Sequence, residues 1–147
     1  MKLSKALKLK NKKITDYNNT ITKMISANSY DITSKRYYDT KLLLEQSIVK
    51  RDDLIKFKTA IHLTSEPIRE KIFRLGEVKH FLMNLNRLST NEGIITSRGY
   101  GSEEVKTYEC TINELDKAAL MEGLQTEIED IQDDIDAFNA TTELKGY

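Results

Sequence analysis

Apolar residues recur every three or four positions along most of this chain, a spacing that predicts helices. The clearest stretch lies near the C-terminus, where the apolar positions follow the a and d pattern of a coiled-coil heptad. These positions are Met121, Leu124, Ile128, Ile131, Ile135 and Phe138. We predict a helix over residues 113–139, with Asn113 as its N-cap and acidic residues in its first turn, where they favour the helix dipole.

The same periodicity predicts a first helix over residues 2–25. Its seam consists of Leu3, Leu7, Lys10, Ile14, Tyr17, Ile21 and Met24, in which only Lys10 is charged. Lysines flank this seam, among them Lys5, Lys8 and Lys12, whereas the C-terminal helix carries many Asp and Glu. We therefore expect the first and last helices to pack side by side, with opposite charges along the edges of an apolar seam.

Two further helices are predicted between these, over about residues 35–63 and 66–89. Turn-forming residues 26–33 precede the first of them, with Thr33 or Ser34 as its cap, and Pro67 stands near the start of the second. The apolar stripe of the 35–63 segment is wide, which is typical of a helix that contacts two others. This pattern predicts a bundle rather than a simple helical hairpin.

Residues 93–111 lack helical periodicity and predict a β-hairpin. Gly93–Ser97 and Val105–Thr111 are rich in alternating β-branched residues, and the turn-forming cluster Arg98–Ser102 separates them. Because an isolated hairpin is marginally stable in water, we expect this one to pack on the helices or on another chain. The predicted fold is mainly α: one domain over 1–147, an antiparallel coiled-coil bundle of four long helices with a hairpin between the third and fourth.

Composition supports a helical protein and shows uneven charge. The 147 residues include one Pro and six Gly, and the formal net charge is zero. Residues 1–75 carry 17 Lys or Arg against 8 Asp or Glu, whereas residues 76–147 carry 6 against 15. This asymmetry indicates either that the two halves neutralise each other or that the basic half binds nucleic acid or a membrane surface.

No targeting or membrane signal is evident from the sequence. The N-terminal lysines are not followed by the apolar segment of a signal peptide, and no run approaches the ~20 apolar residues that span a bilayer. We therefore expect a cytoplasmic protein without a transmembrane segment. The single cysteine, Cys110, excludes an intramolecular disulfide.

The two ends of the chain resemble a known family. The similarity lies in the opening MKLSKAL at residues 1–7 and in a C-terminal pattern of LQ at 124–125, Ile128, IQD at 131–133, ID at 135–136 and NATT at 139–142. In these segments the chain is similar to small bacterial proteins described as septicolysin-like. The resemblance implies a helical protein with a β-hairpin and no catalytic signature. Its family label implies a cytolysin.

Few residues are candidates for chemistry. His62 and His80 are possible metal ligands, as is the acidic cluster Asp130–Asp134, but none has the spacing of a known metal motif. Cys110 with His80 is a candidate nucleophile and base only if the fold brings them together. A helix-surface histidine, a solvated acidic face and a small apolar cysteine are the structural alternatives. The sequence therefore indicates no catalytic, cofactor or metal residues and no small-molecule substrate.

The function expected from these patterns is a non-enzymatic coiled-coil module, structural or protein-binding, that self-associates into a homo-oligomer. The hairpin is the expected contact arm for another copy or another protein, with Arg98 and Tyr100 at its tip. The alternative is a nucleic-acid or membrane-surface binder that uses Lys5, Lys8 and Lys12 of the first helix.

Overall fold

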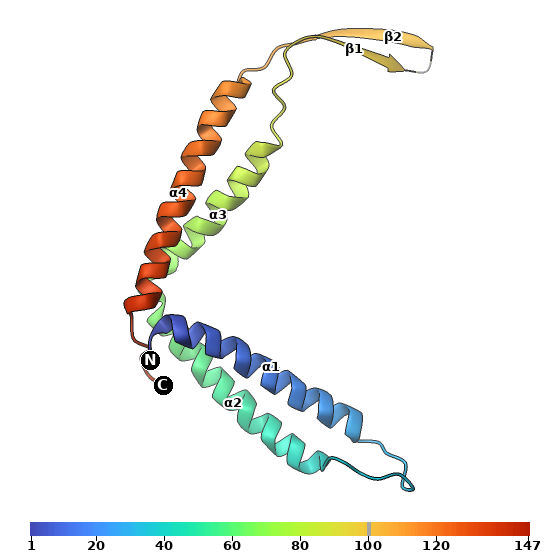
Figure 1. The fold of residues 1–147 in the computed structure, drawn as a ribbon, viewed down its shortest axis with the longest axis vertical. Helices are drawn as coiled ribbons and strands as arrows, with labels where there is room; N and C mark the ends of the chain where they lie inside the picture. The colour runs from blue at the N-terminus through green and yellow to red at the C-terminus, as the bar shows by residue number, and fades with distance from the viewer. Residues whose placement is uncertain (100) are drawn as a thin grey trace. The chain divides into compact units, whose positions relative to one another are not determined.

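The computed structural model describes all of residues 1–147 except residue 100. Within the described residues the chain forms four α-helices, one short 3-10 helix and a two-stranded antiparallel sheet (Figure 1). The elements are α1 (Leu3–Ala27), α2 (Thr40–Thr64), η1 (Glu66–Ile68), α3 (Arg69–Asn86), β1 (Gly93–Gly99), β2 (Ser102–Tyr108) and α4 (Glu114–Thr141). The predicted fold class, mainly α with a hairpin between the third and fourth helices, is confirmed.

The chain divides into two compact units. One consists of Met1–Arg69 together with Asp136–Tyr147, and the other is Glu70–Ile135. Each unit has its own helix pair. The single domain expected over residues 1–147 stays a prediction.

In the first unit α1 and α2 run antiparallel and pack along their lengths (Figure 1). The core at one end of the pair consists of Leu3, Ala6, Phe57 and Ile61, of which Phe57 and Leu3 are fully buried. The seam predicted for the first helix faces inward as expected: Leu3 is buried and the remaining seam residues are half-buried. Burial of this seam against α2 supplies the apolar contact that a lone amphipathic helix lacks.

The two ends of the chain close the first unit. The Leu3 N–H donates to the Thr142 carbonyl at 2.8 Å, and the Leu144 N–H donates to the Met1 carbonyl at 2.8 Å. The Met1 amino group also lies 2.5 Å from the Glu143 carboxylate. Residues 142–147 are therefore part of the packed structure rather than a loose tail.

In the second unit α3 and α4 run antiparallel. Leu85 of α3 and the α4 residues Ile128, Ile131 and Ile135 are buried. Lys117 of α4 donates to the carbonyls of Asn86 and Leu88 at 3.0 and 2.9 Å. Asn113 caps α4 as predicted, since its side chain accepts from the Asp116 N–H at 2.8 Å.

The seam of the first helix packs along α2, so the expected packing of this seam along the last helix is wrong. Phe138, near the end of α4, does pack against the core that contains Leu3 and Ala6. Lysines of α1 pair with acids of α2, as in Lys13 with Asp53, and acids of α4 pair with bases of α3, as in Glu127 with Arg74. Helices that follow each other in the chain pack as antiparallel neighbours through their connections. Charge complementarity did not decide the partner, because an exposed ion pair contributes only about 0–1 kcal/mol.

Several element boundaries differ from the prediction. Helix α2 begins at Thr40 rather than residue 35, because the Asp39 carboxylate caps it by accepting the N–H groups of Lys41 and Leu42 at 2.9 and 3.3 Å. It then continues through His62 to Thr64, and the 3-10 turn η1, with Pro67 inside it, precedes α3. The hairpin strands reach closer to the tip than expected, since Gly99 and Ser102 form the last pair of the ladder.

Candidate interaction site

The β1–β2 hairpin is the most exposed element of the second unit. Its register pairs Gly93 with Tyr108 at the base and Gly99 with Ser102 at the tip. Every residue of both strands is exposed, so nothing in the described part of the chain covers either face. The expected alternative that the hairpin packs on the helices is therefore wrong.

The two faces of the hairpin differ in chemistry. On one face Ile94 and Val105, which are 73% and 62% exposed, lie beside Thr96 and Thr107. The other face carries Ile95 and Tyr108 near the base and the charged pair Glu104 and Lys106, whose polar atoms are 3.4 Å apart. The first face is thus β-branched and uncharged over its lower half, which is the composition of a surface that packs against another sheet or chain.

The tip carries one of the two residues proposed from the sequence. Arg98 lies opposite Glu103, and the Arg98 Nε is 3.6 Å from the Glu103 carboxylate. Both side chains are exposed, so this pair adds little stability. Tyr100, the second proposed residue, lies outside the described residues.

The three lysines proposed as a basic surface lie on one side of α1. Lys5, Lys8 and Lys12 are spaced by three and four residues and are all exposed. The buried Leu3 and Ala6 lie on the opposite side of the helix, which faces α2. These lysines therefore form a basic edge of the first unit that does not take part in its core.

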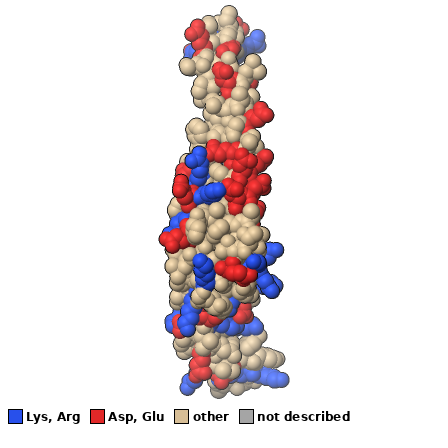
Figure 2. All heavy atoms as spheres, turned by 90° about the vertical axis from the view of Figure 1, so that its left-hand side faces the viewer, with Lys and Arg blue, Asp and Glu red and all other residues tan. Residues whose placement is uncertain are grey.

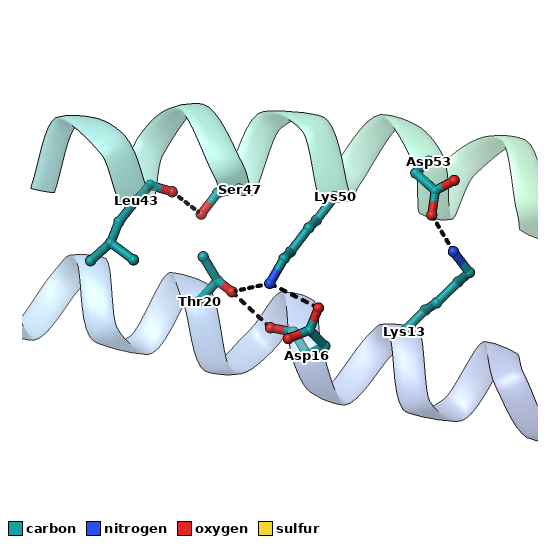
Figure 3. Close-up of polar contacts among 7 residues, drawn as sticks. All are labelled: Lys13, Asp16, Thr20, Leu43, Ser47, Lys50 and Asp53. Atoms are coloured by element: carbon teal, nitrogen blue, oxygen red, sulfur yellow. Dashed lines mark hydrogen bonds and ion pairs between the residues drawn. The ribbon is translucent and has the colours of Figure 1, made fainter. Parts of the chain in front are cut away.

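A ladder of polar contacts joins α1 to α2 (Figure 3). Lys13 of α1 pairs with Asp53 of α2, and Lys50 of α2 reaches back to Asp16 at 2.8 Å and to the Thr20 hydroxyl at 2.9 Å. In one ion pair the lysine belongs to α1 and the aspartate to α2, and in the other the lysine belongs to α2 and the aspartate to α1. The ladder therefore fixes the register of the α1–α2 pair, which is a structural role.

Two groups of this ladder have shifted pKa values. The hydrogen bond from Lys13 and a second from the Tyr147 hydroxyl lower the pKa of the Asp53 carboxyl. The bond to Asp53 raises the pKa of Lys13. Tyr147 also packs edge-on against Phe57, with ring centroids 4.6 Å apart, so the last residue of the chain ties the ladder to the core.

The residues considered for catalysis are not brought together. The Cys110 thiol donates to the Glu92 carboxylate at 3.0 Å rather than to His80. This bond, together with burial, raises the pKa of the thiol to about 11, so Cys110 is protonated and a poor nucleophile at neutral pH. His62 lies 3.1 Å from the Arg69 guanidinium. Among the described residues no group of three His, Cys, Asp or Glu side chains is placed to hold a metal ion.

The acidic face of α4 is partly paired with α3. Figure 2 shows Asp and Glu side chains gathered over the C-terminal half of α4. Asp134 pairs with Lys71, and Glu127 pairs with Arg74 at 2.6 Å. Glu129, Asp130 and Asp133 are exposed. The face is therefore a solvated surface that helps to position α3, which agrees with the structural alternative given for it.

Large apolar side chains remain exposed on the helices of both units. On α2, Leu44, Ile48 and Ile55 form one line on the side away from the buried Leu54 and Phe57. On α3, the exposed apolar residues are Ile72, Phe73, Phe81 and Met83. These side chains are left uncovered by the helix pairs, which agrees with the wide apolar stripes of the sequence.

The α1–α2 connection holds a cluster that sequence reasoning missed. The Arg36 guanidinium lies 4.5 Å from the centre of the Tyr30 ring, and the ammonium groups of Lys35 and Lys23 lie 5.6 Å from the Tyr37 and Tyr38 rings. All are exposed. The signal in the sequence is Lys-Arg-Tyr-Tyr at residues 35–38, which lies before the start of α2 at Thr40 and not in the helix predicted from residue 35.

No helix among the described residues is both long enough and apolar enough to cross a membrane. A scan against protein-family models matches no family, and searches of curated proteins and of solved structures find no similar protein. The resemblance to septicolysin-like proteins therefore stays a prediction.

Proposed function

We propose that this protein is a non-enzymatic interaction module that associates with further copies of itself, with the β1–β2 hairpin as the contact arm. The observation that carries the proposal is the complete exposure of both strands. A two-stranded hairpin without a covered face is marginally stable in water, and contact with another chain supplies the missing packing. The cytoplasmic location expected from the sequence belongs to this proposal.

The exposed apolar surface of the helices supports the same function. Ile94 and Val105 on the hairpin and the Leu44, Ile48 and Ile55 line on α2 are the kind of surface that oligomeric proteins bury between subunits. The polar groups described above serve to hold helices in register, as Lys13 and Asp53 do, and Cys110 is held as a protonated thiol. This division of roles supports a scaffold rather than an enzyme.

Sedimentation velocity over a range of chain concentrations tests the proposal. We expect the weight-average mass of the wild-type protein to rise with concentration above that of the 16.9 kDa chain. The double variant Ile94→Thr/Val105→Thr, which keeps β-branched residues but removes apolar contact, should associate more weakly. The control Ile32→Thr alters an 89% exposed residue of the α1–α2 connection and should behave as wild type. A wild-type protein that stays monomeric throughout would contradict the proposal.

The alternative function is binding of nucleic acid or of an anionic membrane surface. The exposed edge of Lys5, Lys8 and Lys12 favours it, since clustered lysines attract phosphates. Binding of RNA, DNA or anionic vesicles that falls steeply with salt and is lost on changing all three lysines to Glu would support it. Absence of binding at low salt would exclude it. A haemolysis assay with the purified protein tests the cytolytic activity that the family resemblance implies.

A further inference from the structure

We infer that two copies of this chain pair along their β2 strands, antiparallel and centred on Val105, to form a four-stranded sheet in the order β1-β2-β2-β1. This inference rests on the proposed self-association and names the surface and the register. It follows from three features of the hairpin. These are the backbone groups that point outward from β2, the charged side chains that alternate with these groups along the strand, and the self-complementarity of the β2 edge, which the β1 edge lacks.

The outward backbone groups come from the hairpin register. Gly99 and Ser102, the last pair of the ladder, are only three residues apart in sequence. At this spacing the pair can be joined only by bonds between its own N–H and C=O groups, so it is a hydrogen-bonded pair. In an antiparallel ladder hydrogen-bonded and non-bonded pairs alternate. The N–H and C=O groups of Glu103, Val105 and Thr107 therefore point away from β1, along the open edge of β2.

Only one symmetric register satisfies all three of these outward residues. When Val105 lies opposite Val105 of a second copy, Glu103 of each strand lies opposite Thr107 of the other. Each outward N–H and C=O then meets a partner in the ladder of the second strand. Registers centred on Glu104 or on Lys106 pair only two of the three outward residues with each other.

Charge selects the same register. With Val105 at the centre, Glu104 of each copy lies opposite Lys106 of the other. The dimer therefore has two such pairs of opposite charge, one on each side of its two-fold axis. These are non-hydrogen-bonded pairs, in which side chains approach most closely. Centring on Glu104 would instead oppose two glutamates, and centring on Lys106 would oppose two lysines, both unfavourable.

The β1 edge lacks this complementarity. Its outward residues are Ile94, Thr96 and Arg98 by the same alternation. Symmetric pairing about Thr96 would place Arg98 of one copy opposite Ile94 of the other, with no pair of opposite charges. The sequence of β2, and not that of β1, therefore matches a second copy of itself.

The pairing also adds what the single hairpin lacks. It raises the sheet from two strands to four, and a sheet with one apolar face needs three or more strands to be stable in water. The contact between two seven-residue strands is smaller than a standard interface, so we expect a weak dimer that forms with rising concentration.

Charge-swap variants test the inference by sedimentation velocity. Glu104→Lys and Lys106→Glu each replace two attractions by two repulsions, and we expect each variant alone to raise the dimer dissociation constant by about tenfold to a hundredfold. Neither change removes a cross-strand ion pair within the hairpin, since Glu104 lies opposite Ser97 and Lys106 opposite Ile95. Each single swap does replace the same-strand contact between Glu104 and Lys106 by a like-charge pair, and the double variant keeps this contact with its charges exchanged. Matched controls are Glu122→Lys on α4 and Lys58→Glu on α2, both exposed and far from β2 in sequence.

Mixing the two variants makes the test specific for this register. An equimolar mixture of Glu104→Lys and Lys106→Glu restores opposite charges at both positions, so the heterodimer should regain the wild-type dissociation constant within about threefold. The double variant Glu104→Lys/Lys106→Glu should do the same by itself. Rescue by mixing also shows that the single variants are folded.

The outcomes separate this inference from the proposed function. If the wild-type protein associates and the swaps leave its dissociation constant unchanged, or if mixing gives no rescue, the β2 register is wrong while self-association stands. If the wild-type protein is monomeric at every concentration, the proposed function and the inference fail together.

Discussion

Phe57 is one of the two largest fully buried side chains among the described residues, and Phe57→Ala tests the packing of the first unit. Its side chain is 0% exposed, packs with Leu3, Ala6 and Ile61, and meets the Tyr147 ring edge-on. Truncation of a buried Phe to Ala costs about 3–5 kcal/mol through lost burial and the cavity left behind. Because a small protein is stable by only about 5–15 kcal/mol, this is a large fraction of the total.

Urea denaturation followed by far-UV circular dichroism is the suitable assay, since the chain has no Trp for fluorescence. With a typical denaturant slope we expect the midpoint of Phe57→Ala to fall by about 2 M. Measurements at about 10 µM chain or below limit any contribution of association to the free energy of unfolding.

Phe73→Ala is the matched control for this prediction. Phe73 lies on α3 and is 65% exposed, so the same substitution should change the free energy of unfolding by less than about 1 kcal/mol. The reasoning would be refuted if Phe57→Ala cost less than about 1 kcal/mol, or if Phe73→Ala cost as much.

Three further predictions concern single contacts. Hydrogen bonds from Lys13 and the Tyr147 hydroxyl lower the pKa of Asp53. The stabilisation from these bonds should therefore be present above the unfolded pKa of about 3.9 and be lost as pH falls through the lower folded pKa. We expect the urea midpoint of the protein to drop below about pH 5. Cys110, with a pKa of about 11, should react slowly with iodoacetamide at pH 7.5, and Glu92→Gln should speed the reaction. Asp39→Ala removes the cap of α2 and should cost about 1 kcal/mol in the same urea assay.

Each of these has a clear contrary result. Asp53→Asn should flatten the acid-induced loss, and an unchanged slope would show that Asp53 does not titrate as described. A thiol that reacts at neutral pH as fast as free cysteine would contradict the Cys110–Glu92 bond. Asp39→Asn keeps a capping side chain and should retain most of the stability, whereas equal losses for Ala and Asn would argue against the cap.

Local periodicity predicted the elements well, because apolar seams at helical spacing leave little freedom. The heptad positions Ile128, Ile131 and Ile135 are buried as expected, and Asn113 caps α4. The hairpin was predictable from β-branched alternation around a glycine-containing turn.

The partner of each helix was not predictable from charge. Lys13 finds Asp53 on the next helix rather than an acid near the C-terminus, since an exposed ion pair is too weak to override the chain connection. The start of α2 differs from the prediction because Thr33 and Ser34 are also of the residue types that cap helices, whereas it is Asp39 that accepts two N–H groups. The exposure of the hairpin depends on tertiary packing, and no local pattern reports that.

The most direct test of this account is residue-resolved amide hydrogen exchange of β2 by NMR at about 10 µM and about 1 mM chain. In a single copy the N–H groups of Glu103, Val105 and Thr107 point to water along an open edge. Pairing with a second copy covers them, so their exchange should slow by at least about tenfold at the higher concentration. Equal and fast exchange of these three amides at both concentrations would contradict the account.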